Sequence, residues 1–168
     1  MKHLNYLEVI SVATERLAKG QALLTVGGAH PNTMTIGWGS IGYCWGKPVF
    51  TVYVRPQRHT HDLLREQGRF TVSIALTDDR KEIFRMAGAA SGRDVDKFSG
   101  HGITAVPGQA VDAPVVAECQ LHFECVLLEE TRMLGDTMDA GVQARCYPQR
   151  DYHTIYMGEI VDCYRTDV

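Results

Sequence analysis

The fold is decided at Val54-Arg55-Pro56-Gln57-Arg58-His59-Thr60, where an apolar, β-branched run ends and a helical pattern begins. The run covers residues 49–54 and the helical pattern residues 60–67, so arginines and a hydroxyl stand where a strand meets a helix. A helix N-terminus presents free backbone N–H groups and a partial positive charge, and it therefore attracts anions. Arginine adds paired donors that match phosphate oxygens. The stretch predicts a phosphate site.

The side chains of this site are not equally well placed. Pro56 pushes the residue before it toward extended geometry, so Arg55 can point along the strand. Arg58 and Thr60 are therefore the better candidates for phosphate contact. A second interpretation stays open, in which Arg58 is a solvated surface residue and Thr60 only caps the helix.

The rest of the chain alternates mostly with the period of a strand. Helical patterns are short: one is expected over residues 60–68 with Thr60 as its cap, one from Asp78 or Asp79 to residue 84, and one over residues 95–98 capped by Asp94. Strands that follow one another without long helices favour a small antiparallel barrel over a doubly wound fold. We expect strands at residues 21–26, 33–38, 49–54, 70–76 and 154–164.

The clearest alternation runs over residues 117–127. One face of this expected strand is apolar, and the other carries Glu118, Gln120, His122 and Glu124. The polar face predicts a strand with one wet side or one side at a subunit interface. The glycine-rich residues 39–46, flanked by tryptophans, are expected to form a turn and to pack at the barrel rim.

Composition limits the classes of function. The chain has 168 residues, 45% of them hydrophobic, and a net charge of -3, so bulk electrostatics give no support for nucleic-acid binding. Its 5 cysteines include no C-x-x-C pair, which argues against a structural zinc or a disulfide framework. His59, His61 and Asp62 lack a fourth ligand at a suitable spacing, so no metal is expected. Without a long apolar run or a secretory signal, we expect a cytoplasmic protein with no membrane partner.

Three further motifs accompany the opening stretch. Asn32-Thr33-Met34-Thr35-Ile36-Gly37-Trp38 precedes it, Ser91-Gly92-Arg93-Asp94-Val95-Asp96-Lys97-Phe98 follows it, and His153 stands five residues before Gly158. In this order, over roughly residues 8–165, they resemble the flavin reductase-like family, which includes flavoredoxins. The resemblance implies a mainly β fold, a split β-barrel with Greek-key antiparallel strands and a few short peripheral helices. It also implies that residues 1–168 form one FMN-binding domain.

The resemblance assigns expected roles to the motifs. The FMN phosphate is expected at Arg55, Arg58 and Thr60. Successive N–H groups after Ser91 can form an anion-binding nest, with Gly92, Arg93 and Lys97 beside it. In the alternative interpretation, Asp94 only caps its helix, and Arg93 and Lys97 are solvated. The flavin ring and ribityl chain are expected along Asn32, Thr33, Met34 and Thr35.

His153 is expected close to the nicotinamide side of the flavin, although it can also be read as a polar residue at a strand start. Ala87 and Ala90 stand where close relatives often carry a cysteine and a histidine. Any thiol chemistry or polar contact that relatives supply at those two positions is therefore in doubt for this chain.

Two functions from different classes follow. The first is an enzyme, a homodimeric flavin reductase that passes electrons from NADH or NADPH through non-covalent FMN to flavin or another acceptor. The second is a flavoredoxin-like carrier that holds FMN and exchanges electrons with a redox protein partner. A split barrel that binds haem or a deazaflavin, or no cofactor, is a third interpretation. In either of the first two, the flavin carries the redox chemistry and the protein supplies orientation and electrostatics.

Overall fold

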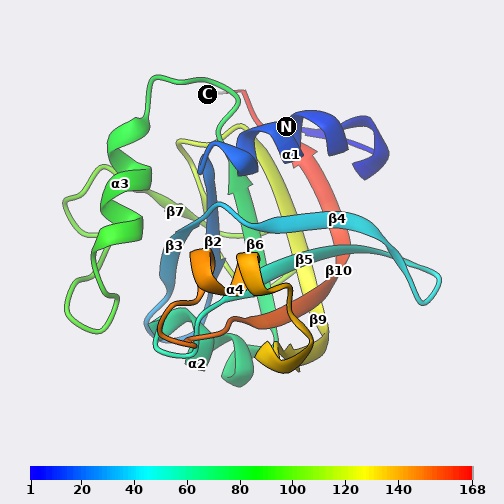
Figure 1. Cartoon of the computed structure of the whole chain (residues 1–168). Helices are drawn as coiled ribbons and strands as arrows, with labels where there is room; N and C mark the ends of the chain where they lie inside the picture. Colours follow the sequence, from blue (N-terminus) through cyan, green and yellow to red (C-terminus); the bar gives the residue numbers. More distant parts are fainter. Residues whose placement is uncertain (168) are drawn as a thin grey trace.

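A curved antiparallel sheet forms the body of the protein in the computed structural model, which describes residues 1–167 (Figure 1). Its strand order is β3-β2-β6-β9-β10-β5-β4, and the short β1 pairs with the end of β10. The strands are β1 (Lys2–His3), β2 (Ala22–Val26), β3 (Asn32–Ile36), β4 (Gly39–Cys44), β5 (Lys47–Val54), β6 (Arg69–Ile74), β9 (Leu121–Arg132) and β10 (Thr154–Arg165).

Four α-helices lie around this sheet within the described residues (Figure 1). They are α1 (Ile10–Ala18), α2 (His59–Gln67), α3 (Lys81–Ala89) and α4 (Ala140–Cys146). Short 3-10 turns at Tyr6–Glu8 and Gly135–Thr137 and a two-stranded pair, β7 (Ala105–Val106) with β8 (Val115–Val116), complete the secondary structure. The prediction of a mainly β fold with short peripheral helices is confirmed, although α1 and α4 had not been predicted.

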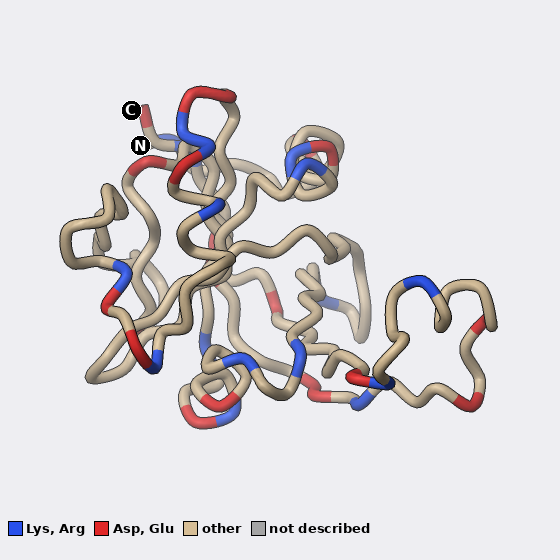
Figure 2. The backbone as a smooth tube through the Cα atoms, turned by 60° about the vertical axis from the view of Figure 1, so that its left-hand side comes forward, with Lys and Arg blue, Asp and Glu red and all other residues tan. Residues whose placement is uncertain are grey.

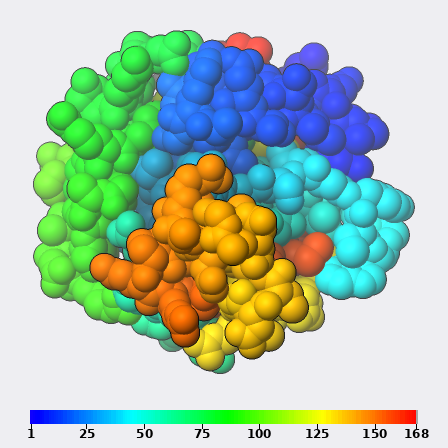
Figure 3. Space-filling view, in the orientation of Figure 1, coloured from blue at the N-terminus to red at the C-terminus, as the bar shows by residue number. Residues whose placement is uncertain are grey.

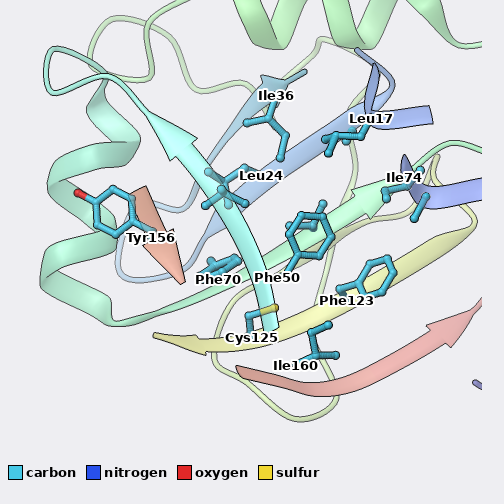
Figure 4. Packing of buried hydrophobic residues seen from close by; sticks show 14 of the residues in the cluster. Leu17, Leu24, Ile36, Phe50, Phe70, Ile74, Phe123, Cys125, Tyr156 and Ile160 are labelled. Carbon is cyan, nitrogen blue, oxygen red and sulfur yellow. The ribbon is translucent and has the colours of Figure 1, made fainter. Parts of the chain in front are cut away.

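The sheet curls around one hydrophobic core (Figure 4). Leu24 from β2, Phe50 from β5 and Phe123 from β9 belong to the same buried cluster, to which β3, β6 and β10 also contribute. At Gly158 a Cβ atom would collide with the Phe70 ring, so glycine is required where β10 crosses this core. Burial of such apolar side chains is the main stabilising term.

The expected closed barrel is not reached by backbone pairing. Within residues 1–167 the sheet ends at β3 on one side and at β4 on the other, and these edges are not hydrogen-bonded to each other. Yet β3 ends at Ile36 and β4 begins at Gly39, so only Gly37 and Trp38 connect the two edges. The sheet therefore wraps most of the way round its core, and the short link spans the remaining gap.

The structure corrects the expectation for the polar face of residues 117–127. His122 and Glu124 are fully buried inside the chain. Glu124 accepts hydrogen bonds from the backbone N–H groups of Gln109, Ala110 and Val111 and from the Tyr164 hydroxyl. A neighbouring loop of the same chain thus covers Glu124, and the His122–Glu124 part of this face is neither wet nor free for a partner subunit.

Three local expectations are also wrong. Residues 39–44 form the edge strand β4 rather than a turn. Residues 95–98 form turns and no helix, because the Asp96 carboxylate bonds to the Phe98 N–H and the Ser99 hydroxyl instead. Thr60 lies inside α2 and does not cap it; Arg58 holds the N-cap position without a side-chain cap bond.

Charged residues are spread over the molecule with both signs interspersed (Figure 2). None of the helices found in residues 1–167 has the length and hydropathy that a membrane crossing requires.

Candidate functional site

A basic pocket of about 440 Å³ lies at the junction that opened the sequence analysis. It forms where the start of β3, the β5–α2 junction and the loop after α3 converge. Eight of the predicted cofactor residues line it: Asn32, Met34, Arg55, Arg58, Thr60, Ser91, Gly92 and Lys97; Gln57, His59 and Ala90 complete the lining.

One buried amide organises the closed end of this pocket. Asn32 Nδ2 donates to Thr60 Oγ1 at 2.8 Å, and both side chains are buried. A Cβ atom on Gly92 would collide with Asn32 Oδ1, so the loop approaches the amide as closely as glycine permits. Since the Thr60 hydroxyl uses a lone pair to accept this bond, its proton remains able to donate into the pocket.

Lys97 supplies a buried positive charge in the same pocket. It is 3% exposed, and Nζ donates to the carbonyls of Thr33 at 2.7 Å and Ala87 at 2.9 Å, which joins β3 to the end of α3. Burial, and then the nearby charge of Arg58, lower the pKa of Lys97 from 10.5 to about 8. The ammonium has three protons, so one is left for a ligand.

The three arginines have different surroundings. Arg58 donates to the Gly88 carbonyl at 3.3 Å and is otherwise exposed at the start of α2. Arg55 forms an ion pair with Asp151 and donates to the Cys146 carbonyl at 3.1 Å. It thereby fastens residues 133–151, which contain α4 and which we call the α4 segment, to the sheet. Arg93 is paired with Asp62 at 2.6 Å and lies outside the pocket lining. Arg58 is thus the arginine least committed to other partners.

A second pocket of about 220 Å³ continues the first. The two share Met34, Arg55 and Arg58, so together they form one elongated cleft, which we call the main cleft. Thr35 lines this second part, and its hydroxyl donates to the Phe84 carbonyl at 2.5 Å. Thr33 points away from both pockets, because its side chain is buried in the sheet against Thr25.

His153 lies at the far end of the main cleft. Its Nδ1 is 2.8 Å from the Tyr147 hydroxyl, and its ring centroid is 5.0 Å from that of Trp38. Burial, followed by the charges of Arg55 and Arg58, lowers the pKa of His153 to about 4. The imidazole is therefore neutral near neutral pH and can orient a ligand without adding charge.

Sequence reasoning missed several residues of this cleft. Tyr53 projects from β5 into its far end, and a strand that alternates by period two could have placed it there. Tyr147, which does not line the cleft but contacts His153, had no sequence signal, because it follows the unpredicted α4. His59 also lines the cleft, although the sequence analysis considered it only as part of a possible metal site. Burial and the positive charge of Arg93 lower the pKa of His59, which agrees with its positive surroundings.

Comparison with known proteins agrees with this arrangement. Residues 14–167 match the family described as flavin reductase like domain. The chain belongs to that family. This confirms the resemblance seen in the motifs, and the match covers all of the residues that line the main cleft.

The flavin reductase-like chain is similar both to a reductase and to flavin-binding proteins. It is 29% identical over 120 residues to a ferric-chelate reductase (NAD(P)H) of Archaeoglobus fulgidus, a match that covers 67% of this chain and 71% of that protein. It is 28% identical to the solved flavoredoxin of Desulfovibrio vulgaris (Miyazaki F), with a TM-score of 0.68 and coverage of 87% of this chain and 69% of that chain. An FMN-binding protein from Thermus thermophilus, solved with 1-cyclohex-2-enone, is 26% identical, with a TM-score of 0.67 and coverage of 86% and 68%.

Proposed function

We propose that this flavin reductase-like chain holds FMN non-covalently in the main cleft and transfers electrons to it from NADH or NADPH. The observation that carries the proposal is the polarity of the cleft. One end is basic and lies at the N-terminus of α2, and the other end is ringed by Trp38, Tyr53 and His153. A phosphate suits the first end and a flat, largely uncharged ring suits the second.

The basic end fits a phosphate dianion. The lowered pKa values of Lys97 and His59 have a neighbouring positive charge among their causes, Arg58 for the lysine and Arg93 for the histidine. An anion placed among these groups would relieve that repulsion. Thr60, Arg58 and Lys97 would hold the phosphate, while Asn32 and Gly92 keep Thr60 in position.

The other residues of the cleft bind and orient. The redox chemistry, which is acceptance of hydride and onward transfer of electrons, would be supplied by FMN. Met34 offers an apolar contact to the ring, and the backbone of β3 offers directional donors and acceptors beside it. Since the Thr35 hydroxyl is committed to the Phe84 carbonyl, its contact with the cofactor would come through the backbone. His153, neutral and held by Tyr147, would position the nicotinamide.

The relatives support an oxidoreductase and leave room for a second function. The ferric-chelate reductase favours an enzyme that uses NAD(P)H. The flavoredoxin favours an electron carrier that holds FMN and meets a redox protein. Mixing the protein with FMN and NADH or NADPH without oxygen separates the two: rapid bleaching of the flavin supports the enzyme. A flavin that stays oxidised until a protein donor is added supports the carrier and rejects the enzyme.

We also propose a homodimer, as the family resemblance implies. The polar face of residues 117–127 no longer supports it, because Glu124 and His122 are buried within one chain. The exposed aromatic side chains of the β4–β5 hairpin, Tyr43 and Trp45, are an alternative contact surface. Sedimentation at several concentrations tests the proposal: twice the chain mass agrees with it, and a monomer at all concentrations rejects it.

A further inference from the structure

A second cavity lies on the other side of the Gly37–Trp38 link. It has a volume of about 440 Å³, opens to solvent, and lies between the end of α1, the link itself, β5 and the α4 segment. Figure 3 shows the α4 segment, in orange, in front of the sheet and next to the blue N-terminal part of the chain. The residues around the cavity are Thr14, Leu17, Ala18, Gly37, Trp38, Gly39, Tyr53, Met133, Val142, Cys146 and Tyr147.

The lining of this cavity differs in kind from that of the main cleft. All of the described side chains around it are formally uncharged near neutral pH, and the rings of Trp38, Tyr53 and Tyr147 form part of its wall. Trp38 and Tyr147 meet edge to face, with centroids 6.2 Å apart at 71°. The basic end of the main cleft, in contrast, is lined by Arg55, Arg58 and Lys97.

The cavity adjoins the ring end of the main cleft. Both are lined by Gly37, Trp38 and Tyr53. A molecule in the cavity would therefore lie next to whatever occupies the space beside His153. Tyr147 lines the cavity and His153 lines the main cleft, and the Tyr147 hydroxyl is 2.8 Å from His153 Nδ1.

We propose that this cavity binds an uncharged aromatic compound as the second substrate of the oxidoreductase. The assignment of the molecule as a substrate rests on the proposed function, whereas its binding rests on the cavity alone. The volume lies within the range of small-molecule sites, which are mostly apolar with a few polar groups. A charged molecule would lose hydration there without meeting a counter-charge, so the cavity selects against it.

The wall of the cavity is held in place from the main cleft. Arg55 donates to the Cys146 carbonyl and pairs with Asp151, and its guanidinium lies 5.4 Å from the centroid of the Tyr147 ring. The α4 segment is thereby tied to β5, which shapes the cavity before any ligand arrives. Val142 lines the cavity and is 38% exposed, so a substitution there can change the cavity with little cost to the core.

Calorimetry on the protein without added flavin tests the proposal, with 2-naphthamide and 2-naphthoate as probes that differ chiefly in charge. The amide should bind, and the carboxylate should bind at least about tenfold more weakly. Val142→Asp should weaken amide binding about tenfold or more, while Val142→Asn should weaken it much less. Leu134→Asp introduces the same charge in the same segment but outside the cavity, so it should leave amide binding unchanged.

Equal binding of both probes, no binding of either, or equal effects of Val142→Asp and Leu134→Asp would overturn the proposal. Circular dichroism of each variant shows whether it is folded. If Val142→Asp does not fold, Ala18→Phe takes its place, because the phenyl ring would fill the cavity from α1. Ala18→Phe should likewise weaken amide binding about tenfold or more. A parallel FMN titration distinguishes a failure of the proposed cavity site from a failure of the proposed FMN site. Failure of FMN binding with intact probe binding rejects the proposed function and leaves the aromatic site standing.

Discussion

Asn32 Nδ2 donates to Thr60 Oγ1 at 2.8 Å and so joins the first residue of β3 to the first turn of α2. On its other side, Asn32 Oδ1 faces Gly92 at a place where no Cβ would fit. Three segments that are distant in the sequence therefore meet at one buried amide. This contact fixes the closed end of the main cleft before a cofactor binds, which lowers the ordering cost of binding.

Gly92→Ala should disturb this meeting point. The new methyl group must push the loop away from Asn32, and such overpacking typically costs about 1–3 kcal/mol. We expect FMN to bind about tenfold more weakly or worse. Gly42→Ala is the matched control, because a Cβ there meets open space. Fluorescence titration with FMN measures both variants, and equal affinities would show that the loop does not shape the phosphate end.

Arg58→Ala should weaken FMN binding while the fold persists, since the side chain is exposed and makes one bond to a carbonyl. Loss of a charge-assisted phosphate contact costs about 1.5–3 kcal/mol, or about ten- to a hundredfold in affinity. Arg85→Ala, an exposed arginine on α3, controls for the loss of one positive charge. If the two variants bind FMN alike, Arg58 belongs to the solvated surface and the phosphate contact passes to Lys97.

The affinity for FMN should fall as the pH rises above about 8, where free Lys97 loses its proton. The sign follows from linkage. A bound phosphate stabilises the ammonium and raises its pKa, so the complex keeps a proton that the free protein has already released. Lys97→Met should bind FMN more weakly and lose this pH dependence. Titrations above about pH 7, where the phosphate is mainly dianionic, decide the matter. A wild-type affinity that stays constant across pH 8 would show that Lys97 does not meet the phosphate.

His153→Ala should slow reduction by a nicotinamide donor more than it weakens FMN binding. The ring lies beside Trp38 at the far end of the main cleft, where it could place a nicotinamide at reacting distance. Because the pKa of His153 is about 4, this histidine stays unprotonated near neutral pH. Its titration should therefore add no pH dependence there to the rate at which wild type is reduced. Anaerobic stopped-flow measurements with NADH and NADPH test this, and Tyr147→Phe tests the supporting hydroxyl. If wild type is reduced and His153→Ala matches its rate, the histidine is a structural residue.

The sequence predicted well where local pattern decides structure. The strands β2, β3, β5, β6 and β10 lie within two residues of their predicted bounds, and α2 ends at Gly68, which adopts a left-handed conformation. The residues grouped by motif, such as Asn32, Arg58 and Gly92, do converge on one pocket. Local chemistry was sufficient because strand ends, helix starts and glycine loops carry residue-type signals.

The sequence did not predict contacts between segments that lie far apart along the chain. Glu124 seemed to face water, because no local pattern shows that residues 109–111 return to cover it with N–H donors. Arg55 seemed free for phosphate, yet Asp151 lies almost a hundred residues away along the chain and binds it. The contact that holds His153 was missed for the same reason, since Tyr147 reaches His153 only through the folded α4 segment.

The cofactor itself tests the central claim most directly. The purified protein, incubated with equal FMN and FAD and then freed of unbound flavin, should release chiefly FMN on heating when chromatographed against standards. The stoichiometry should approach one FMN per chain, because each chain has one basic pocket at the start of α2. Release of chiefly FAD, or of no flavin at all, would contradict the account.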